Sequence, residues 1–430
     1  MIDLLPVPQD RFLCPCGGGA MQADGFWLPG MMPLARCRCG VCGRRWLHHL
    51  HVGFAGSSNL ALEEATGDMH NTITLGWYAA ELEAMWRSRD RPAPRVDVRG
   101  AFDAQGRDVV LINTLDPTYG HNIARLFAVT SVKQLYPESA VIVIAARFTA
   151  WLVPENVDQI WVVDAPLREL HLANSTVDAL TQELMRKASR LRYAPLFYGA
   201  PVRIEDFTKQ TPFDARSLAD VLPARLTFNW REDRCWTYLS RALPPTEALD
   251  DHLRLATLLF QRLRREIPDL EIAVTGYGRH GRFPDWVEDL RITEQTDAAE
   301  REWVRRYARS HLVMGVHGSN MHLPCAHAAG SIEITPGWLW TNAFDTWEWV
   351  NHVPANIALG RYLKIPQSTS LSEMASIAFI LIRRMQTQAV YQLMGSLSDP
   401  SDRERLMIHA FPAVSGGYPI TIEGADGKPL

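Results

Sequence analysis

Apolar runs alternate with segments of helical periodicity through much of the first half of this chain. Residues 108–114 (DVVLINT), 140–146 (AVIVIAA) and 159–166 (QIWVVDAP) are largely apolar on both faces, as in strands buried within a parallel sheet. Between the first two, residues 123–135 place apolar side chains at helical spacing. Because strands that alternate with helices indicate a doubly wound parallel sheet, we expect an α/β unit here.

The same alternation restarts after a junction near residues 195–225, which indicates a second α/β unit. The strands expected in it are 224–229, 271–278, 310–316 and 331–336, and the expected helices are 250–265, 297–309 and 371–393. We expect the last of these helices to return to the first unit.

Cysteine is concentrated near the start of the chain. Five of the seven cysteines lie within the first 42 residues, in the strings CPCGGG and CRCGVCGRRW. Two knuckle-like turns separated by an insert of hairpin length are typical of a zinc ribbon. A closed structural zinc site has four ligands, and we expect them to be Cys14, Cys16, Cys39 and Cys42.

Other zinc ligands, and other states of these cysteines, remain possible. Cys37 is the first substitute, and His48, His49 or His51 could replace one thiolate. The alternative to metal is a set of free cysteines or a disulfide pair. A catalytic zinc keeps an open coordination position, and nothing in the sequence indicates one, so we expect the metal to be structural.

Composition and charge restrict the choice of partners and compartment. The formal net charge is −4, so the chain has no basic surplus with which to neutralise a nucleic-acid backbone. The first residues do not resemble a secretory signal, and the longest apolar runs are too short to cross a bilayer. We therefore expect a cytoplasmic protein with reduced cysteines and no nucleic acid or transmembrane segment.

Polar and glycine-rich loops follow four of the strands expected in the second unit. The loops are NWREDR, TGYGRHG, GVHGSN and EITPG. In open α/β sheets, ligands bind beyond the carboxyl ends of the strands, which meet at one edge. We therefore expect the four loops to converge around one ligand.

The loop GVHGSN carries the features of a phosphate-binding turn. Gly315, Gly318 and Ser319 allow close backbone approach, and His317 can donate to a phosphate oxygen. The alternative is a tight strand–helix turn with a capping serine. Glu333, at the end of the next strand, either accepts two ribose hydroxyls or caps a turn.

Two further loops supply a cation and a flat surface. Arg231 would face a diphosphate and stabilise the charge of a leaving group, with Arg234 as second choice; the alternative is ion pairing within residues 231–234. In the loop after residue 275, three residues would let a base or ribose lie against the backbone with the aromatic ring stacked on it: Gly276, Tyr277 and Gly278.

The string HGSNMHLPCAHAAGSIEITP (317–336) resembles the donor half of GT-B glycosyltransferases, in particular the family of plant xylosyltransferases and related bacterial enzymes. The arginine after the first strand of the second unit is similar to that of fucosyltransferase-like GT-B enzymes. The resemblance covers residues 226–352 and the strand–turn–helix at 108–135. Asn320 stands where the family has a third glycine-type residue after His-Gly, yet it falls within the expected donor loop.

The resemblance implies two Rossmann-like domains, with a nucleotide-sugar donor in the cleft between them and chemistry that needs no metal. The expected division is a zinc-ribbon-like module (1–55), an N-terminal Rossmann-like acceptor domain (56–215), a C-terminal Rossmann-like nucleotide-sugar domain (216–365), and a C-terminal helix and tail (366–430) packing back on the N-terminal domain. The acceptor, whether glycan, lipid-linked or protein, stays open.

In the first unit, the turn at residues 116–122 would then face the acceptor. An inverting transferase needs a base for the acceptor hydroxyl, and His121 or Asp116 could supply it. Alternatively, Asp116 forms a turn before Pro117 and His121 starts a helix.

Two other functions remain possible for such a chain. One is a non-catalytic protein that binds a glycan or a protein through its cysteine-rich module and its tryptophan-rich stretch at 338–349. The other is a different Rossmann-like enzyme, such as an epimerase or a dinucleotide enzyme. The lack of a G-x-G-x-x-G string after an early strand argues against this second alternative.

Overall fold

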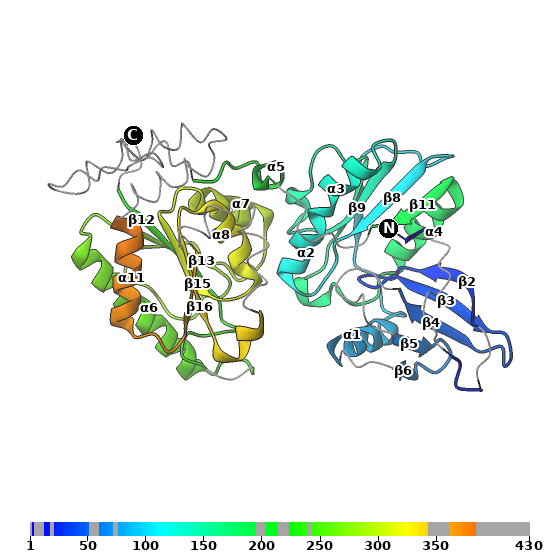
Figure 1. Ribbon diagram of the computed structural model, residues 1–430, viewed down its shortest axis with the longest axis horizontal. Coiled ribbons are helices and arrows are strands. Elements are labelled where there is room, and N and C mark those ends of the chain that lie inside the picture. Colours follow the sequence, from blue (N-terminus) through cyan, green and yellow to red (C-terminus); the bar gives the residue numbers. More distant parts are fainter. Residues whose placement is uncertain are drawn as a thin grey trace, which may run out of the picture. The chain divides into compact units, whose positions relative to one another are not determined.

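The computed structural model divides into two compact units, Met1–Thr208 with Gln295–Asp297 (unit 1) and Lys209–Glu294 with Ala298–Leu430 (unit 2). The residues described are 2–3, 13–17, 21–50, 60–71, 76–194, 203–213, 223–238, 242–342 and 362–383. Each unit is built on a mainly parallel sheet (Figure 1). This confirms the expectation of an α/β protein with two parallel-sheet units.

A six-stranded sheet forms the centre of unit 1. Its order is β1 (Ile2–Asp3), β11 (Arg190–Tyr193), β8 (Asp108–Asn113), β9 (Ala140–Ala146), β10 (Gln159–Val163) and β7 (Val96–Arg99). The four inner strands are parallel, whereas β1 and β7 pair antiparallel at the edges. All seven residues of β9 are buried, which explains its continuous apolar run.

One expected helix of unit 1 is divided in two, and another helix begins at a side-chain cap. The segment expected as one helix at 123–135 forms α2 (Tyr119–Leu126) and α3 (Ala128–Leu135), divided at Phe127. Helix α4 (Ser175–Lys187) begins at Asn174, whose side chain accepts hydrogen bonds from the backbone amides of Thr176 and Val177.

A five-stranded antiparallel sheet completes unit 1. It runs in sequence order through β2 (Met21–Trp27), β3 (Leu34–Cys39), β4 (Arg45–His49), β5 (Leu60–Glu63) and β6 (Met69–Asn71). It therefore continues past residue 55, where we expected the N-terminal module to end.

Alternation of side chains gives this antiparallel sheet two buried faces. One face, with Leu34, Leu47 and Leu62, packs against α1 (Gly76–Arg87). The other face, with Phe26 and Trp46, joins the apolar core of the parallel sheet. The cysteine-rich sheet is thus an integral layer of unit 1.

Unit 2 contains a wholly parallel sheet of six strands. Its order is β14 (Val287–Asp289), β13 (Glu271–Gly276), β12 (Arg225–Trp230), β15 (Leu312–Val316), β16 (Ser331–Thr335) and β17 (Tyr362–Pro366). The helices of this unit are α6 (Thr246–Glu266), α7 (Asp297–Tyr307), the short α8 (His322–His327) and α11 (Leu371–Arg383).

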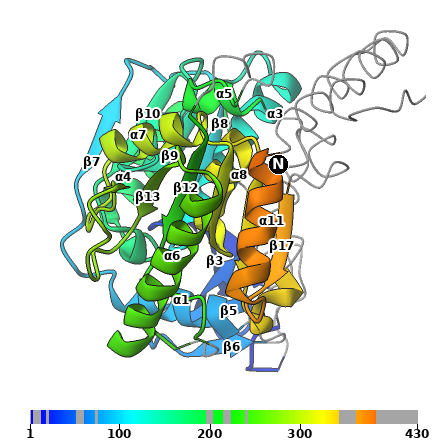
Figure 2. The same ribbon diagram turned by 90° about the vertical axis from the view of Figure 1, so that its left-hand side faces the viewer.

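The C-terminal helix differs from our expectation. Helix α11 lies beside α6 (Figures 1 and 2). Its apolar face, with Met374 and Ala378 fully buried, belongs to the core of unit 2. The prediction that this helix packs back on the first unit is therefore wrong for α11, because its apolar face packs against α6 and the core of its own unit. Residues 384–430 lie outside the described residues.

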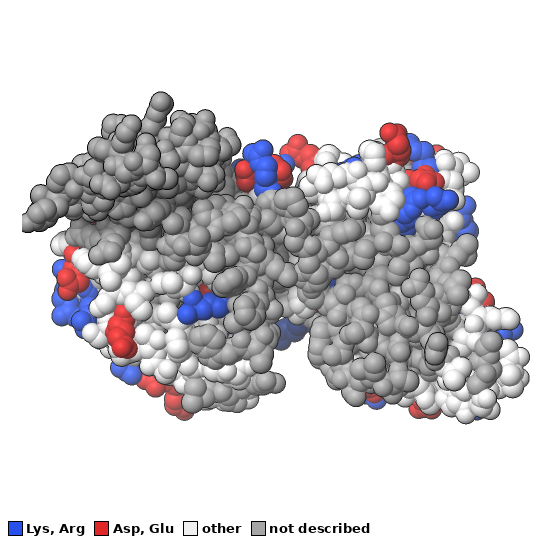
Figure 3. Space-filling model, in the orientation of Figure 1, with Lys and Arg blue, Asp and Glu red and all other residues white. Residues whose placement is uncertain are grey.

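Two surface properties follow from the described residues. None of their helices combines the length and the apolar character needed to cross a bilayer. On the face drawn in Figure 3, basic and acidic side chains are interspersed, and no extended patch of one sign is visible among the described residues.

Candidate functional site

The loops after β12 and β15 meet at the carboxyl end of the unit 2 sheet. Arg231 Nη1 donates to the side-chain Oδ1 of Asn320 at 2.8 Å and lies 3.3 Å from the backbone oxygen of His317. Asn229 Nδ2 in turn donates to the backbone oxygen of Asn320 at 2.6 Å. The convergence of these loops, expected from the parallel pattern, is therefore present.

Gly318 lies directly against the two arginines of this cluster. A Cβ added at Gly318 would lie 2.1 Å from Arg231 Nη1 and 2.8 Å from Arg234 Nη1. Its backbone has φ 154° and ψ 178°, a combination that residues other than glycine essentially do not adopt. Glycine is therefore required here both for the backbone and for the close approach of the guanidinium groups.

The arginines are only partly neutralised. Asp233 pairs with Arg231, accepting from Nε at 2.6 Å, so the alternative of an ion pair within residues 231–234 is realised. Arg234 donates to the backbone oxygen of His317 at 2.9 Å and lies 5.3 Å from the centre of the Trp338 ring. Burial and the neighbouring Arg231 lower the pKa of Arg234 to about 10.

Asn320 adds a donor beside these two cations. Its Nδ2 is inaccessible to solvent and has no hydrogen-bond partner among the described residues. Ser319, the neighbouring residue, begins a short 3-10 turn (Ser319–Met321), and no side-chain hydrogen bond caps that turn. The site thus holds two guanidinium groups, one carboxylate and one unsatisfied amide donor.

Glu333 is buried beneath the loop and pairs with the His317 ring. The Glu333 side chain is fully buried; Oε2 pairs with His317 Nδ1, and Oε1 accepts from Cys325 Sγ at 3.6 Å. This arrangement does not fit the prediction that Glu333 binds ribose hydroxyls, because both of its oxygens are occupied. It also fixes the His317 ring so that Nε2 is the nitrogen left for another partner.

The loop after β13 is held tightly against β12. A Cβ on Gly276 (φ 108°) would lie 2.0 Å from the backbone oxygen of Trp230, and one on Gly278 (φ 102°) would lie 2.0 Å from the Glu232 carboxyl carbon. Both positions therefore require glycine.

The aromatic residue of this loop faces its own unit. Tyr277 donates to Glu300 Oε1 at 2.5 Å and packs edge-on against Trp303, with ring centres 5.2 Å apart. That orientation leaves the expected stacking of Tyr277 on a base without support.

In unit 1, the turn after β8 gathers a carboxylate, an imidazole and a guanidinium. Asp116 is fully buried, with one oxygen 3.1 Å from His121 Nδ1 and the other 3.1 Å from Arg125 Nη2. The backbone amide of Thr118 donates to Asp116 at 2.8 Å. Burial alone would raise the pKa of Asp116, but Arg125 and His121 outweigh it and keep this pKa below the usual value.

The two base candidates therefore differ in access. Asp116 has no exposed surface, whereas the His121 side chain is 25% exposed. The alternative that Asp116 is a turn former is also realised, because its side chain accepts from Thr118 two residues on. Of the pair, His121 is the group that a substrate hydroxyl could reach.

A second carboxylate–imidazole pair lies near Asp116 and was missed from the sequence. Glu81 of α1 lies 3.3 Å from His171 Nδ1, and both side chains are partly exposed. Burial and the negative charge of Asp116 raise the pKa of Glu81. No sequence signal connects positions so far apart, because α1 reaches this site through its packing on the antiparallel sheet.

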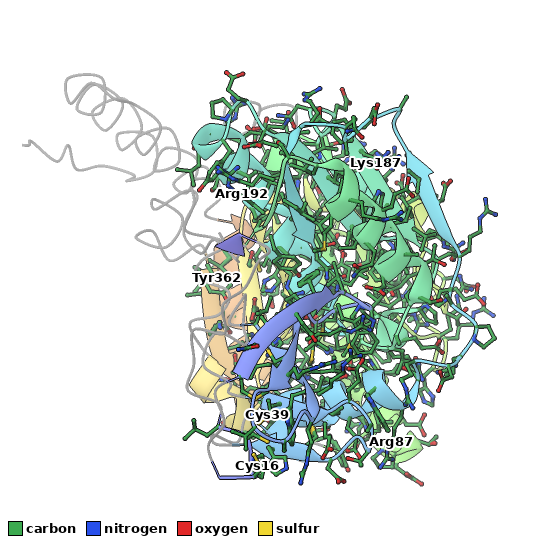
Figure 4. All side chains as sticks on the ribbon, turned by 90° about the vertical axis from the view of Figure 1, so that its right-hand side faces the viewer. Cys16, Cys39, Arg87, Lys187, Arg192 and Tyr362 are labelled. Atoms are coloured by element: carbon green, nitrogen blue, oxygen red, sulfur yellow. The ribbon has the colours of Figure 1, made fainter. Side chains whose placement is uncertain are left out.

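The four cysteines chosen from the sequence come together at the end of the antiparallel sheet, where Figure 4 labels Cys16 and Cys39. Their sulfur atoms all lie within 4.8 Å of one another, with Cys14–Cys42 and Cys16–Cys39 at 3.6 Å. Sulfurs about 2.3 Å from a tetrahedral zinc are about 3.8 Å apart, so the cluster fits such an ion. Backbone amides of Cys42 and Val41 lower the pKa of Cys39 to about 6, which favours the thiolate that a metal binds, whereas burial raises the pKa of Cys14 to about 12.

The alternative ligands take other positions. Cys37 is buried in β3 outside the cluster, with its sulfur 4.0 Å from the backbone oxygen of Ala35, and burial raises its pKa to about 12. His48 and His49 are buried in β4 and do not belong to the cluster. His51 lies outside the described residues.

Comparison with known proteins yields only weak likenesses. No protein-family model and no curated protein sequence matches the chain. Among solved structures, a glycosyl transferase family 9 protein from Veillonella parvula shares 11% identity at TM-score 0.37, covering 69% of this chain and all (100%) of the other.

Two nucleotide-bound structures are similar to the same degree. The Escherichia coli heptosyltransferase WaaC with ADP has 12% identity and TM-score 0.34, covering 65% of this chain and 99% of its own. The MnaA–UDP structure from S. aureus has 13% identity and TM-score 0.29, covering 73% and 78%. At these values the likenesses are remote.

Proposed function

We propose that this protein is a glycosyltransferase whose unit 2 binds the diphosphate of a nucleotide-sugar donor at the ends of β12 and β15. The observation that carries the proposal is the position of the Arg231 guanidinium, which bridges Asn320 and the backbone of His317 directly beside Gly318. Guanidinium groups are suited to phosphate oxygens in charge and in geometry.

The charges of this cluster support an anionic ligand. Arg231 and Arg234 carry two positive charges against the single carboxylate of Asp233, which pairs with Arg231. Gly318 allows both guanidinium groups to lie directly against the loop, because a Cβ there would be 2.1 Å from Arg231 Nη1 and 2.8 Å from Arg234 Nη1. In the proposed reaction these groups stabilise the charge that develops on the departing nucleoside diphosphate.

His317 is assigned a donor role toward a phosphate oxygen. Its Nδ1 is occupied by Glu333, which orients the ring and leaves Nε2 for the ligand. Glu333 is accordingly a positioning residue in this proposal, replacing its expected role as a ribose ligand.

In unit 1, His121 is assigned the role of general base toward the acceptor hydroxyl. Asp116 lies behind its Nδ1 and stabilises the imidazolium that proton transfer would create. The acceptor in this proposal is a hydroxyl compound: a glycan, a lipid-linked sugar or a protein.

The metal is assigned a structural role. Cys14, Cys16, Cys39 and Cys42 provide four thiolates and therefore a closed zinc site without a position for substrate. We expect zinc to stabilise the antiparallel sheet of unit 1 and to take no part in the transfer.

A thermal-shift panel of UDP, GDP, dTDP, CMP and ADP tests the donor site. A nucleotide at one hundred times its dissociation constant adds about 2.7 kcal/mol of stability, or about 5–10 °C for a domain of this size. Arg231→Ala and His317→Ala should abolish this shift. Arg282→Ala, which removes an exposed arginine paired with Asp285 elsewhere in unit 2, is the charge-matched control and should retain it. No shift with any of the five nucleotides would refute the donor site.

A further inference from the structure

The hairpin loop between β2 and β3 packs tightly against the parallel-sheet part of unit 1. Residues 26–35 are all buried. A Cβ added at Gly30 would lie 2.7 Å from the backbone oxygen of Leu172, so the loop touches that backbone with no room for a side chain. Gln182 Nε2 of α4 donates to the backbone oxygen of Phe26 at 2.7 Å, which fixes the other end of the hairpin.

A continuous chain of polar contacts leads from this loop to His121. Asn113, at the end of β8, donates through Nδ2 to the backbone oxygens of Gly30 (2.7 Å) and Met31 (3.3 Å). Its Oδ1 accepts from the backbone amide of Leu115 at 3.1 Å. Asn113 is 4% exposed, so water does not compete for these bonds.

The next contacts continue to the candidate base. The backbone oxygen of Leu115 accepts from Arg125 Nη1 at 2.8 Å. The other terminal nitrogen of Arg125 pairs with Asp116, and Asp116 pairs with His121, each at 3.1 Å. The position of the imidazole is thus linked, contact by contact, to the hairpin of the cysteine-rich sheet.

The cysteine cluster stabilises the same sheet at its other end. Cys39 is the last residue of β3, whose first residue, Leu34, follows the hairpin loop. Cys14 and Cys39 belong to one apolar core with Leu111 of β8 and Ile144 of β9. A change at the cysteines can therefore reach the hairpin through β3 and through this shared core.

We propose that the cysteine-rich sheet is a scaffold of the acceptor-side site, and that Asn113 is the positioning residue that couples it to the Asp116–His121 pair. The proposal rests on the proposed zinc site and on the proposed role of His121. Zinc stabilises the antiparallel sheet, and the sheet fixes the conformation of the hairpin. Through its hydrogen bonds to the hairpin, Asn113 restrains residues 115–126.

Hydrogen exchange measured by mass spectrometry on the full chain tests this coupling without an activity assay. The wild type is compared with zinc bound and after chelation, with metal content measured in the same samples. Loss of one hydrogen bond to a buried loop should raise exchange in residues 115–126 about two- to tenfold. A peptide from β9 (140–146) serves as the reference within unit 1.

Two variants separate coupling from general weakening. Asn113→Ala with zinc bound should reproduce the faster exchange of residues 115–126, and chelation should then add less than it does in the wild type. Thr181→Ala removes a buried hydrogen bond within α4 that involves neither the hairpin nor Asp116, and should leave residues 115–126 as in the wild type. If Asn113→Ala does not fold, the chelation experiment on the wild type decides alone.

Unchanged exchange in residues 115–126 after chelation, with faster exchange in residues 34–39, would overturn the coupling. An equal rise in the β9 peptide would also overturn it, because the effect would then be a loosening of the whole unit. Protein that binds no zinc would remove the metal from both proposals. The nucleotide panel on unit 2 does not depend on any of these results, so failure of the coupling and failure of the donor site can be told apart.

Discussion

Replacing Gly318 by alanine perturbs the proposed donor site at a single carbon atom. The backbone at this position lies in a region essentially confined to glycine, and holding another residue there costs about 1–3 kcal/mol. The added Cβ would also lie 2.1 Å from Arg231 Nη1, so the guanidinium must move away from the loop. Arg231 is held by Asp233 and by Asn320, so this movement breaks at least one hydrogen bond.

The expected result has two parts. Calorimetry should show the melting temperature falling by about 2–12 °C, since 1 kcal/mol corresponds to about 2–4 °C in a domain of this size. The nucleotide-induced shift should be lost as well, because Arg231 no longer lies beside the loop. Gly337→Ala is the matched control in the same unit: its Cβ would meet no atom of the described residues within 4 Å. A Gly318→Ala protein as stable as Gly337→Ala, with an unchanged nucleotide shift, would refute the reasoning.

The remaining predictions concern the metal, the buried carboxylate and the loop after β13. Cys39→Ser should lose the bound metal and lower the melting temperature of unit 1, whereas Cys37→Ser should keep one metal per chain; equal metal content in both would contradict the assignment of ligands. The pKa of Asp116 in the folded protein is below its unfolded value of 3.8. The ionised carboxylate therefore stabilises the fold fully above pH 3.8, and this stabilisation is lost as the pH falls through the folded pKa. Asp116→Asn should therefore be destabilised by about 1–3 kcal/mol at pH 7, and the difference from the wild type in urea titrations should shrink below pH 3.8; a difference independent of pH would argue against this. Gly276→Ala should destabilise unit 2 by about 2 kcal/mol or more, because its Cβ would lie 2.0 Å from a backbone oxygen and its φ is 108°; a denaturation midpoint like that of Gly337→Ala would speak against the tight loop.

The central strands were the most predictable part of the fold. β9 was expected at 140–146 and is observed at Ala140–Ala146, and β12, β13 and β16 begin or end within two residues of their expected bounds. These strands are buried on both faces, so each is a continuous apolar run that contrasts with its neighbours.

The edges and the antiparallel layer were not predictable in the same way. β5, β6 and β7 are three or four residues long, too short for a period of two to be recognised. Their pairing depends on partners distant in the sequence, such as β10 for β7. The position of α11 depends likewise on its packing against α6, a contact that the sequence pattern does not reveal.

The proximity of four of the predicted residues could be inferred from the sequence, but their individual contacts could not. Arg231, His317, Gly318 and Asn320 do come together, because loops at the carboxyl ends of neighbouring parallel strands must meet. The solvent exposure of each side chain was not predictable, because the side chain of a residue at a strand end can point either into the core or into solvent. Glu333 and Asp116 are therefore buried partners of His317 and His121, whereas the sequence pattern also allows each of them to contact substrate directly.

Asn320, the departure from the resembled family's pattern, has a clear local explanation. Its side chain accepts from Arg231, and its backbone oxygen accepts from Asn229, so it joins the ends of β12 and β15. A glycine at this position would supply the backbone acceptor only. The asparagine thus fixes the guanidinium in the position on which the donor-site proposal depends.

A crystal structure with the nucleoside diphosphate that gives the largest thermal shift tests the central claim most directly. The account predicts the diphosphate within hydrogen-bonding distance of the Arg231 and Arg234 side chains and of the backbone around Gly318. A nucleotide bound at another edge of unit 2, or in unit 1 alone, would contradict it.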